Sequence, residues 1–369
     1  MIEKGKISAL QMAFMMYPLV VATGDLLIPA ITGKLAERDM WLSPIWASLG
    51  GFLTVYVVYQ LSRLYPKQTI IQYSQQIAGR IPGKLLGFLI LFYIYYADSM
   101  ILRQYGEFVV GIFLPTTPMI LVIGSMTLLS AFAVGGGVEV LGRESQMFVP
   151  IVILFWILTI LLTLPDMETD NMFPILAKGI MPSLLGSIPP MGWFTHFMVL
   201  AFLLPFLGEG EKGLKWANIS VIAIMVTLAA INIAVLLVFG GLSAKLIYPA
   251  MSVARYISLA DFLEHLESIT MAIWVVGVFL KFSVYYYALA LGTAQWLNLS
   301  DYRPVVFPLG FLLAASSIWM GPNLSYLASF LGTIAPFYNI SSELLIPILL
   351  LLIALLRKKN QQKKGAQQA

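Results

Sequence analysis

Two segments of the chain combine residues that interrupt helices with polar groups that could hold a small charged ligand. The first covers residues 21–25, which read Val-Ala-Thr-Gly-Asp, and Pro29 follows one turn later. The second covers residues 188–196 and contains a double proline. Proline removes a backbone donor and glycine weakens a helix, so unpaired N–H and carbonyl groups are expected in both segments. Such N–H groups suit a carboxylate, and such carbonyl groups suit an ammonium.

The two segments therefore predict a pocket for a zwitterion such as an amino acid. The residues expected to line it are Ala22, Thr23, Gly24, Asp25, Gly192, Trp193, Phe194 and Thr195, with Tyr96 and Tyr287 at its edge. Two alternatives stay open at this point. The double proline could mark the start of a helix, and Asp25 could cap a half-helix instead of contacting a ligand.

Charged residues also stand inside long apolar runs, where each needs a partner or a wet cavity. Lys281 and Asp98 both lie near the middle of such a run, and a direct pair between them is expected. This pair is either purely structural, or the Lys281 ammonium takes the place of a coupling cation. Arg103 and Glu107 are four residues apart on one helix face. They are expected to form either a salt bridge that satisfies both residues or an outer gate.

Two further ionisable residues, His196 and Glu343, lie in or beside apolar runs. His196 adjoins the second interrupted segment and is either a hydrogen-bonded packing residue or a gate that responds to pH. Glu343 lies inside an apolar run, and no role is assigned to it from the sequence.

The elements that position these residues follow from an apolar composition. Of the 369 residues, 59% are hydrophobic and 11% are charged, and the mean hydropathy is +0.87. Soluble domains are about half apolar and about a quarter charged. The charges cluster between apolar runs of roughly 20 residues, the length that crosses a bilayer. We therefore predict an all-α, multi-pass membrane protein. Its basic residues reflect membrane topology, and no nucleic-acid partner is expected.

Ten transmembrane helices are predicted from the apolar runs between charged, proline and glycine clusters. They lie near 8–32, 41–61, 85–113, 117–135, 141–164, 186–208, 216–240, 268–296, 304–320 and 336–356. An even number places both termini on one side. The loops and tail on that side hold fifteen Lys and Arg residues, against five on the other, which predicts cytoplasmic termini. The first helix is expected to stay, since no cleavage site for a signal peptide is visible.

The spans also predict a repeat. Interrupted helices one and six are five crossings apart and run in opposite directions, and spans three and eight are both about 29 residues long. We therefore expect one transmembrane domain over residues 1–356, with inverted repeats at about 8–164 and 186–356.

Four segments outside the predicted spans complete the layout. Residues 68–79, 172–185 and 243–266 are expected to be helical without crossing the membrane. Residues 357–369 form a polybasic cytoplasmic tail that would be drawn to anionic lipids.

Four stretches of the sequence resemble the spore germination permease family, the B subunits of germinant receptors in endospore-forming bacteria. They read KISALQMAFMMYPLVVATGDLLIPA from residue 6, LRQYGEFVVGIFLPTTP at 102–118, GRESQMFVPI at 142–151 and FLLPFL at 202–207. The family is similar in turn to amino acid/polyamine/organocation transporters, whose fold is the LeuT-like five-plus-five inverted repeat. The resemblance implies a germinant-binding subunit in the spore inner membrane, working with an A-type membrane subunit and a C-type lipoprotein.

Other classes of function find little support. The sequence has no cysteine and two histidines, which argues against metal centres built from those residues, and no cofactor is expected. The Walker, zinc-protease and serine-hydrolase motifs are absent, so no enzyme is predicted. The leading hypothesis is a sensor of a small nutrient. The alternative is a proton-coupled amino acid transporter that acts alone.

Overall fold

The computed structural model describes residues 3–208, 210–256 and 266–368, and these are almost entirely helical. Its α-helices are α1 Ala9–Ala36, α2 Ser43–Leu64, α3 Ile70–Ala78, α4 Arg80–Ile112, α5 Met119–Gly136, α6 Val138–Leu162, α7 Met181–Phe194, α8 Leu200–Leu203, α9 Gly213–Phe239, α10 Pro249–Tyr256, α11 Leu266–Leu297, α12 Arg303–Trp319, α13 Leu324–Thr333, α14 Ala335–Asn339 and α15 Ile346–Gln368.

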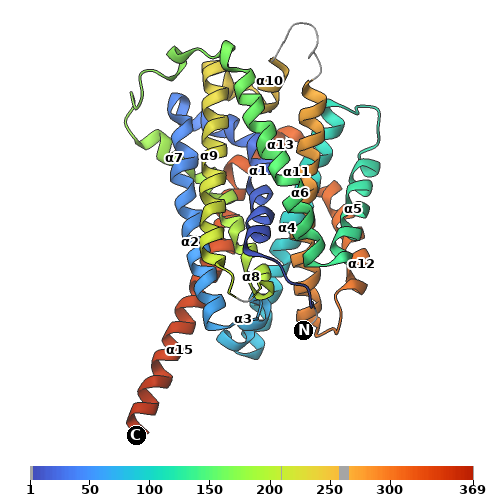
Figure 1. Ribbon diagram of the computed structural model, residues 1–369, viewed down its shortest axis with the longest axis vertical. Coiled ribbons are helices and arrows are strands. Elements are labelled where there is room, and N and C mark those ends of the chain that lie inside the picture. The colour runs from blue at the N-terminus through green and yellow to red at the C-terminus, as the bar shows by residue number, and fades with distance from the viewer. Residues whose placement is uncertain (1–2, 209, 257–265, 369) are drawn as a thin grey trace.

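By length and hydropathy, eight helical stretches of the described residues could cross a membrane, or up to nine if the bent pair α12 and α13 counts as one span. The first stretch, Ala9–Leu64, holds two helices. The chain turns at Glu37, where φ is 51°, and α2 then runs back alongside the core (Figure 1). The predicted number of ten spans stays a prediction. Both termini lie at one end of the molecule, as an even number requires (Figure 1).

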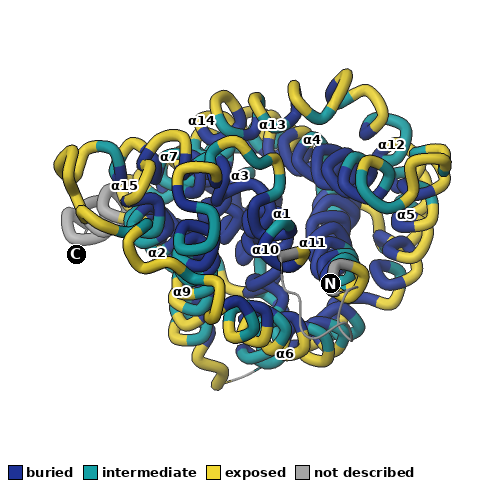
Figure 2. The backbone as a smooth tube through the Cα atoms, turned by 90° about the horizontal axis from the view of Figure 1, so that it is seen from above, coloured by how far each residue is buried: buried dark blue, intermediate teal, exposed yellow. Residues whose placement is uncertain are grey.

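Helix α1 is the centre of the fold. Every residue from Met15 to Ala30 is buried, and the helix packs against α6, α7, α9 and α11. A helix that is apolar all round is stable only when neighbours surround it. Seen from above, α1 lies among the buried parts of the other helices, while exposed residues gather on the outer helices (Figure 2). Those exposed apolar residues are the expected lipid-facing surface.

The helices pack in two groups of four. Helices α1, α2, α7 and α9 pack against one another, and α4, α5, α11 and α12 form the second group. Each group takes two helices from each half of the chain, as an inverted repeat predicts. The two long helices expected at equivalent positions are α4 and α11, with 33 and 32 residues, and they pack together.

The predicted break in the first span is wrong, because α1 continues through Thr23, Gly24 and Asp25 to Ala36. One glycine and one proline withdraw too few hydrogen bonds to end a helix whose backbone has no water to turn to. The sixth span is interrupted, although not at its prolines. Helix α7 runs through the double proline to Phe194, and 3-10 turns then begin at Thr195.

The non-spanning segments agree in part with expectation. Helix α3 confirms the short helix at 68–79. The helix expected over 172–185 is wrong, because the chain is irregular until Met181, with Leu176 and Gly179 at positive φ. Of the helix expected over 243–266, α10 is present, and residues 257–265 lie outside the described part of the chain.

The N-terminal segment is tied to the end of the sixth span. Ile7 N donates to Phe206 O at 3.0 Å, and Gly208 N donates to Ile7 O at 3.1 Å, which makes a small parallel bridge between Ile7 and Leu207. The side chain of Glu211 accepts from Ala9 N at 3.1 Å. Three hydrogen bonds thus hold the start of the first repeat against the end of the first span of the second repeat.

At Gly83, α3 and α4 approach each other too closely for a side chain. A Cβ at Gly83 would lie 2.4 Å from Gln75 Cα, so α3 and α4 could not pack as they do. We expect Gly83→Ala to lower the free energy of unfolding by about 1–3 kcal/mol. The measurement is the melting temperature of the purified protein in detergent. The control is Gly124→Ala, since a Cβ at Gly124 meets nothing within 4 Å. Equal melting temperatures for the two variants would contradict the packing argument.

Candidate functional site

Thr23, halfway along α1, joins three helices. Its hydroxyl oxygen accepts a hydrogen bond of 3.0 Å from Trp193 Nε1 on α7 and one of 2.8 Å from Lys281 Nζ on α11. Gly24 lies beside the same tryptophan, since a Cβ built there would be in ordinary contact with Trp193 Cδ1 at 3.7 Å. The predicted contact between these two segments is therefore present, although α1 is unbroken.

Lys281 is 1% exposed and lies among acidic groups. The carboxyl groups of Glu343, Asp25 and Asp98 all lie within range of electrostatic interaction with its side chain. The expected direct pair with Asp98 is not formed. Both oxygens of Asp98 lack a hydrogen-bond partner among the described residues, because the long lysine side chain reaches α1 and donates to Thr23 instead.

Glu343 is the residue that the sequence did not assign, and it is fully buried. Its Oε2 accepts from Thr195 Oγ1 at 2.9 Å and lies 2.8 Å from His196 Nδ1, and its Oε1 accepts from Tyr285 OH at 2.9 Å. The residue sits in a π-helical turn, Ile340–Leu345, a distortion that is frequent at functional sites. Glu343 therefore fastens the last span to the interruption in the sixth.

The end of α7 shows how this interruption is stabilised. The Gly192 carbonyl accepts from Asn339 Nδ2 at 3.2 Å, and it shares with Glu343 Oε2 the single proton of the Thr195 hydroxyl, which is 2.9 Å from each. Asn339 Oδ1 in turn accepts from Tyr93 OH at 3.1 Å. Side chains thus satisfy a carbonyl that the helix no longer uses, as a polar backbone group in a membrane requires.

These residues surround a small buried cavity, which we call the central cavity. Its free space is about 30 Å³, enough for one or two water molecules. Its polar lining comes from α1, α4, the sixth span, α11 and α14, and consists of Thr23, Tyr96, Gln104, Trp193, His196, Lys281 and Asn339. The buried atoms Tyr96 OH and Gln104 Oε1 have no hydrogen-bond partner among the described residues. The cavity therefore offers a cation and unused polar groups together.

The predicted pocket residues separate into two sets. Thr23, Trp193, His196, Tyr96 and Lys281 line the central cavity. Ala22 and Asp25 line a different cavity on the other side of α1.

Other predicted residues have neighbours elsewhere. A Cβ at Gly192 would lie 2.7 Å from Pro336 Cα, and one at Gly51 would lie 2.9 Å from Phe194 Cδ1, so Gly192 and Phe194 pack against α14 and α2. Tyr287 packs edge-on against Tyr302.

The ion pair expected on α4 is present. Arg103 Nη2 lies 2.5 Å from Glu107 Oε1, and Arg103 Nη1 donates to the Ile318 carbonyl at 2.7 Å. Its part as a gate stays a prediction. Within the described residues, no group of three or more His, Asp and Glu side chains could hold a metal ion.

One of the residues that the sequence reasoning missed had a visible signal. Glu343 is the one charge inside the predicted span 336–356, and a lone charge at such a place is a functional hypothesis by default. Gln104 and Asn339 gave no comparable signal, because polar uncharged residues are common in spans and their direction depends on helix rotation.

The junction at Thr23 can be tested by removing its hydroxyl. Thr23→Val keeps the shape and leaves the Lys281 ammonium and the Trp193 N–H without an acceptor. We expect a loss of about 1.5–3 kcal/mol in the free energy of unfolding, seen as a lower melting temperature in detergent. Thr23→Ser keeps the oxygen and should retain most of the stability. A serine variant as unstable as the valine variant would rule out the hydroxyl as the cause.

The two buried acids Glu343 and Asp98, which both interact with Lys281, should respond differently to replacement by their amides. Glu343→Gln places an amide N–H₂ where Thr195, His196 and Tyr285 need acceptors, so we expect a loss of about 1–3 kcal/mol. Asp98→Asn breaks no hydrogen bond among the described residues and should change stability by less than about 1 kcal/mol. The melting temperatures of the two variants are compared in the same detergent. Equal losses of stability would contradict the role of Glu343 as the shared acceptor of these hydrogen bonds.

Comparison with known proteins identifies relatives over nearly the whole chain. The family model described as "Spore germination protein" matches residues 6–325. Spore germination protein KB of Bacillus subtilis is 26% identical over 355 residues, and the match covers 94% of each chain. Spore germination protein YndE of the same organism is 27% identical over 299 residues, covering 79% of this chain and 81% of that protein.

Solved transporter structures share the fold at much lower identity. MhsT in complex with L-phenylalanine matches with a TM-score of 0.63 and 11% identity, covering 96% of this chain and 99% of that one. A Na⁺-coupled sialic acid symporter matches with a TM-score of 0.65 and 12% identity, covering 92% and 79%. These likenesses show the LeuT-like fold of a multi-pass membrane protein. With the family match over residues 6–325, the chain belongs to the spore germination protein family.

Proposed function

We propose that the protein is the germinant-sensing membrane subunit of a spore germination receptor and binds an amino acid, or a similarly small polar nutrient, in the central cavity. Family membership and relatives named as spore germination proteins support the germination role. The observation that carries the ligand class is the central cavity itself, where a buried lysine and two unpartnered polar atoms face one space.

The lining suits the two charges of a zwitterion. The Lys281 ammonium, already steered by Thr23, would bind the carboxylate through a charge-assisted hydrogen bond. Gln104 Oε1 is an unused acceptor for the ligand ammonium. This arrangement replaces the half-helix N-terminus expected from the sequence, since α1 is continuous. The rings of Trp193 and Tyr96 would then contact the ligand side chain.

The size of the central cavity limits the ligand. Its free space of about 30 Å³ is smaller than an amino acid, so side chains or helices must move to admit one. Apolar walls from Met100, Ile101 and Leu331 favour a small or medium apolar side chain over a long charged one.

Location and partners complete the proposal. We place both termini in the cytoplasm and the protein in the spore inner membrane. The distribution of Lys and Arg supports the orientation. The family resemblance supports partnership with an A-type membrane subunit and a C-type lipoprotein. The basic residues after Leu356 would add attraction to anionic lipids.

A second candidate function, proton-coupled amino acid transport by this chain alone, draws on one observation. Lys281, Glu343 and His196 form a buried group of ionisable side chains beside the central cavity. Such groups mark proton pathways in membrane proteins. Uptake into proteoliposomes separates the two functions: accumulation of amino acid driven by a pH gradient favours the transporter, and saturable binding without accumulation favours the sensor.

The zwitterion site can be tested with labelled L-leucine bound to the purified protein. Unlabelled amino acids from alanine to leucine in size should compete better than lysine or glutamate. Isopentylammonium, which is leucine without its carboxylate, should compete at least tenfold less well, since it cannot use Lys281.

Lys281→Met should lower leucine affinity at least tenfold. The matched control is Lys212→Met, which removes an exposed lysine outside the central cavity. If sugars compete while amino acids and their amides do not, the ligand class is wrong.

A further inference from the structure

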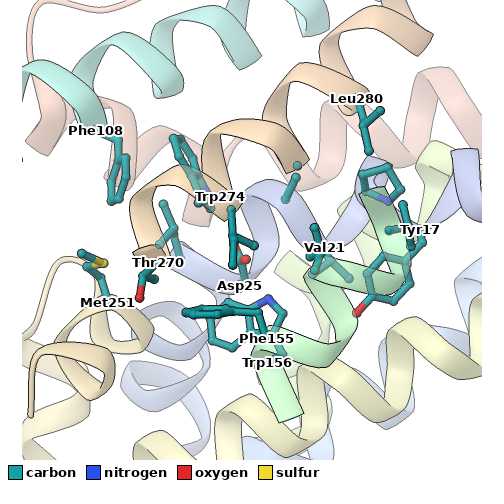
Figure 3. Close-up of a pocket in the computed structure, with 17 residues that line it drawn as sticks. Tyr17, Val21, Asp25, Phe108, Phe155, Trp156, Met251, Thr270, Trp274 and Leu280 are labelled. Atoms are coloured by element: carbon teal, nitrogen blue, oxygen red, sulfur yellow. The ribbon is translucent and has the colours of Figure 1, made fainter. Parts of the chain in front are cut away.

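A second cavity lies on the opposite side of α1 from the central cavity, and we call it the Asp25 cavity. It is enclosed by α1, α6 and α11, with Phe108 of α4 and Met251 of α10 at one end (Figure 3). Asp25 and Thr23 are two residues apart, which separates their side chains by about 200° around the helix. The two cavities therefore share α1 as a wall and have different lining residues on it.

The Asp25 cavity contains a carboxyl group with one oxygen that accepts no hydrogen bond within the described part of the chain. Asp25 is 3% exposed, and its Oδ1 has no hydrogen-bond partner among the described residues. The indole N–H of Trp274, which lines the same cavity, also lacks one among them. The Trp274 indole interacts with the Asp25 carboxyl group, and the free acceptor position of Asp25 Oδ1 is left for a ligand, since an unpaired buried polar atom costs about 1–3 kcal/mol.

Aromatic rings make up much of the wall around this carboxyl group. Tyr17, Phe108, Phe155, Trp156 and Trp274 all line the cavity. In the close-up, Asp25 lies between Trp274 on one side and Phe155 with Trp156 on the other (Figure 3). Faces of aromatic rings attract cations, most strongly when water is excluded. A carboxyl group enclosed by rings is thus suited to a positively charged organic group.

The same wall is poorly suited to a metal ion. Beside Asp25, the described lining residues supply side-chain oxygens from two hydroxyl groups, Tyr17 and Thr270. The Tyr17 hydroxyl already bonds Thr227 Oγ1 at 2.9 Å. Calcium and magnesium take six or more oxygen ligands, and the remaining lining side chains present carbon, the Met251 thioether or indole N–H. An organic cation needs one anionic partner and an apolar surface, and this cavity supplies both.

We propose that the Asp25 cavity is a second ligand site that binds a small apolar amine in its ammonium form. The ammonium lies against Asp25, and the alkyl group lies against the aromatic rings. The free space of about 20 Å³ restricts the amine to a few carbon atoms and requires side chains to move. Met251, at one end of the cavity, has the unbranched and adaptable side chain that such a movement needs.

The test measures direct binding of isopentylammonium to the purified full chain by calorimetry, with isopentanol as the neutral molecule of the same shape. The wild type should bind the amine at least tenfold more tightly than the alcohol. Asp25→Asn should abolish this difference. The matched control is Asp98→Asn, which removes another buried carboxyl group outside both cavities and should leave amine binding unchanged.

Two further measurements exclude unfolding of the Asp25 variant and binding of the amine at the amino acid site as explanations. Trp156→Leu keeps the carboxyl group and removes a ring, so it should weaken amine binding several-fold even if Asp25→Asn unfolds the protein. Saturating L-leucine should not displace the amine, since the proposed amino acid site is on the other side of α1. Loss of leucine binding with intact amine binding would reject the zwitterion site alone.

Four results would overturn the second site. They are equal binding of amine and alcohol to the wild type, equal effects of the Asp25 and Asp98 changes, displacement of the amine by leucine, and displacement by sodium ions at equal concentration.

Discussion

A lysine buried in a hydrocarbon layer must find hydrogen bonds inside the protein, and this requirement organises the centre of the molecule. Lys281 meets it by donating to Thr23, which also accepts from Trp193. One hydroxyl group thereby holds helices from both repeats at one point. The arrangement needs α1 to be helical there, because an unwound segment would present its own carbonyl groups to the lysine. The continuous helix α1 keeps its backbone carbonyl groups paired, so the Thr23 side chain is the acceptor that it offers to Lys281.

The two repeats share an architecture but not a site. Each four-helix group takes two helices from each half, yet the first spans of the two halves differ: α7 gives way to 3-10 turns at Thr195, and α1 does not unwind. The difference follows from the side chains nearby. Thr195 and Asn339 satisfy the released Gly192 carbonyl, and Glu343 holds Thr195 and His196 from the last span. Trp193 and Lys281 donate hydrogen bonds to the hydroxyl group of Thr23 and not to backbone carbonyl groups. The backbone hydrogen bonds of α1 therefore stay within the helix.

The sequence predicted much of the fold and less of the site, for a physical reason. Span lengths, the long helices α4 and α11 and the short helix α3 follow from hydropathy and spacing, which are local properties. The meeting of Thr23 with Trp193 followed from the repeat. The partner of Lys281 did not, because its choice between Asp98 and Thr23 depends on how far α11 is rotated. Asp25 was assigned to the wrong side of α1 for the same reason, and Glu343 required the path of the last span.

The bridge between Ile7 and Leu207 has a mechanical consequence. It fastens the beginning of one repeat to the end of the interrupted span in the other, through paired backbone hydrogen bonds that must break together. A tether of this kind resists small displacements and then releases as a unit, so separation of the two segments is abrupt rather than gradual. If the sixth span shifts when a ligand enters, the stress passes along Leu207 to the N-terminal segment. The segment just before α1, from Glu3 to Ile7, would then be held at the membrane surface or released from it according to the position of the sixth span.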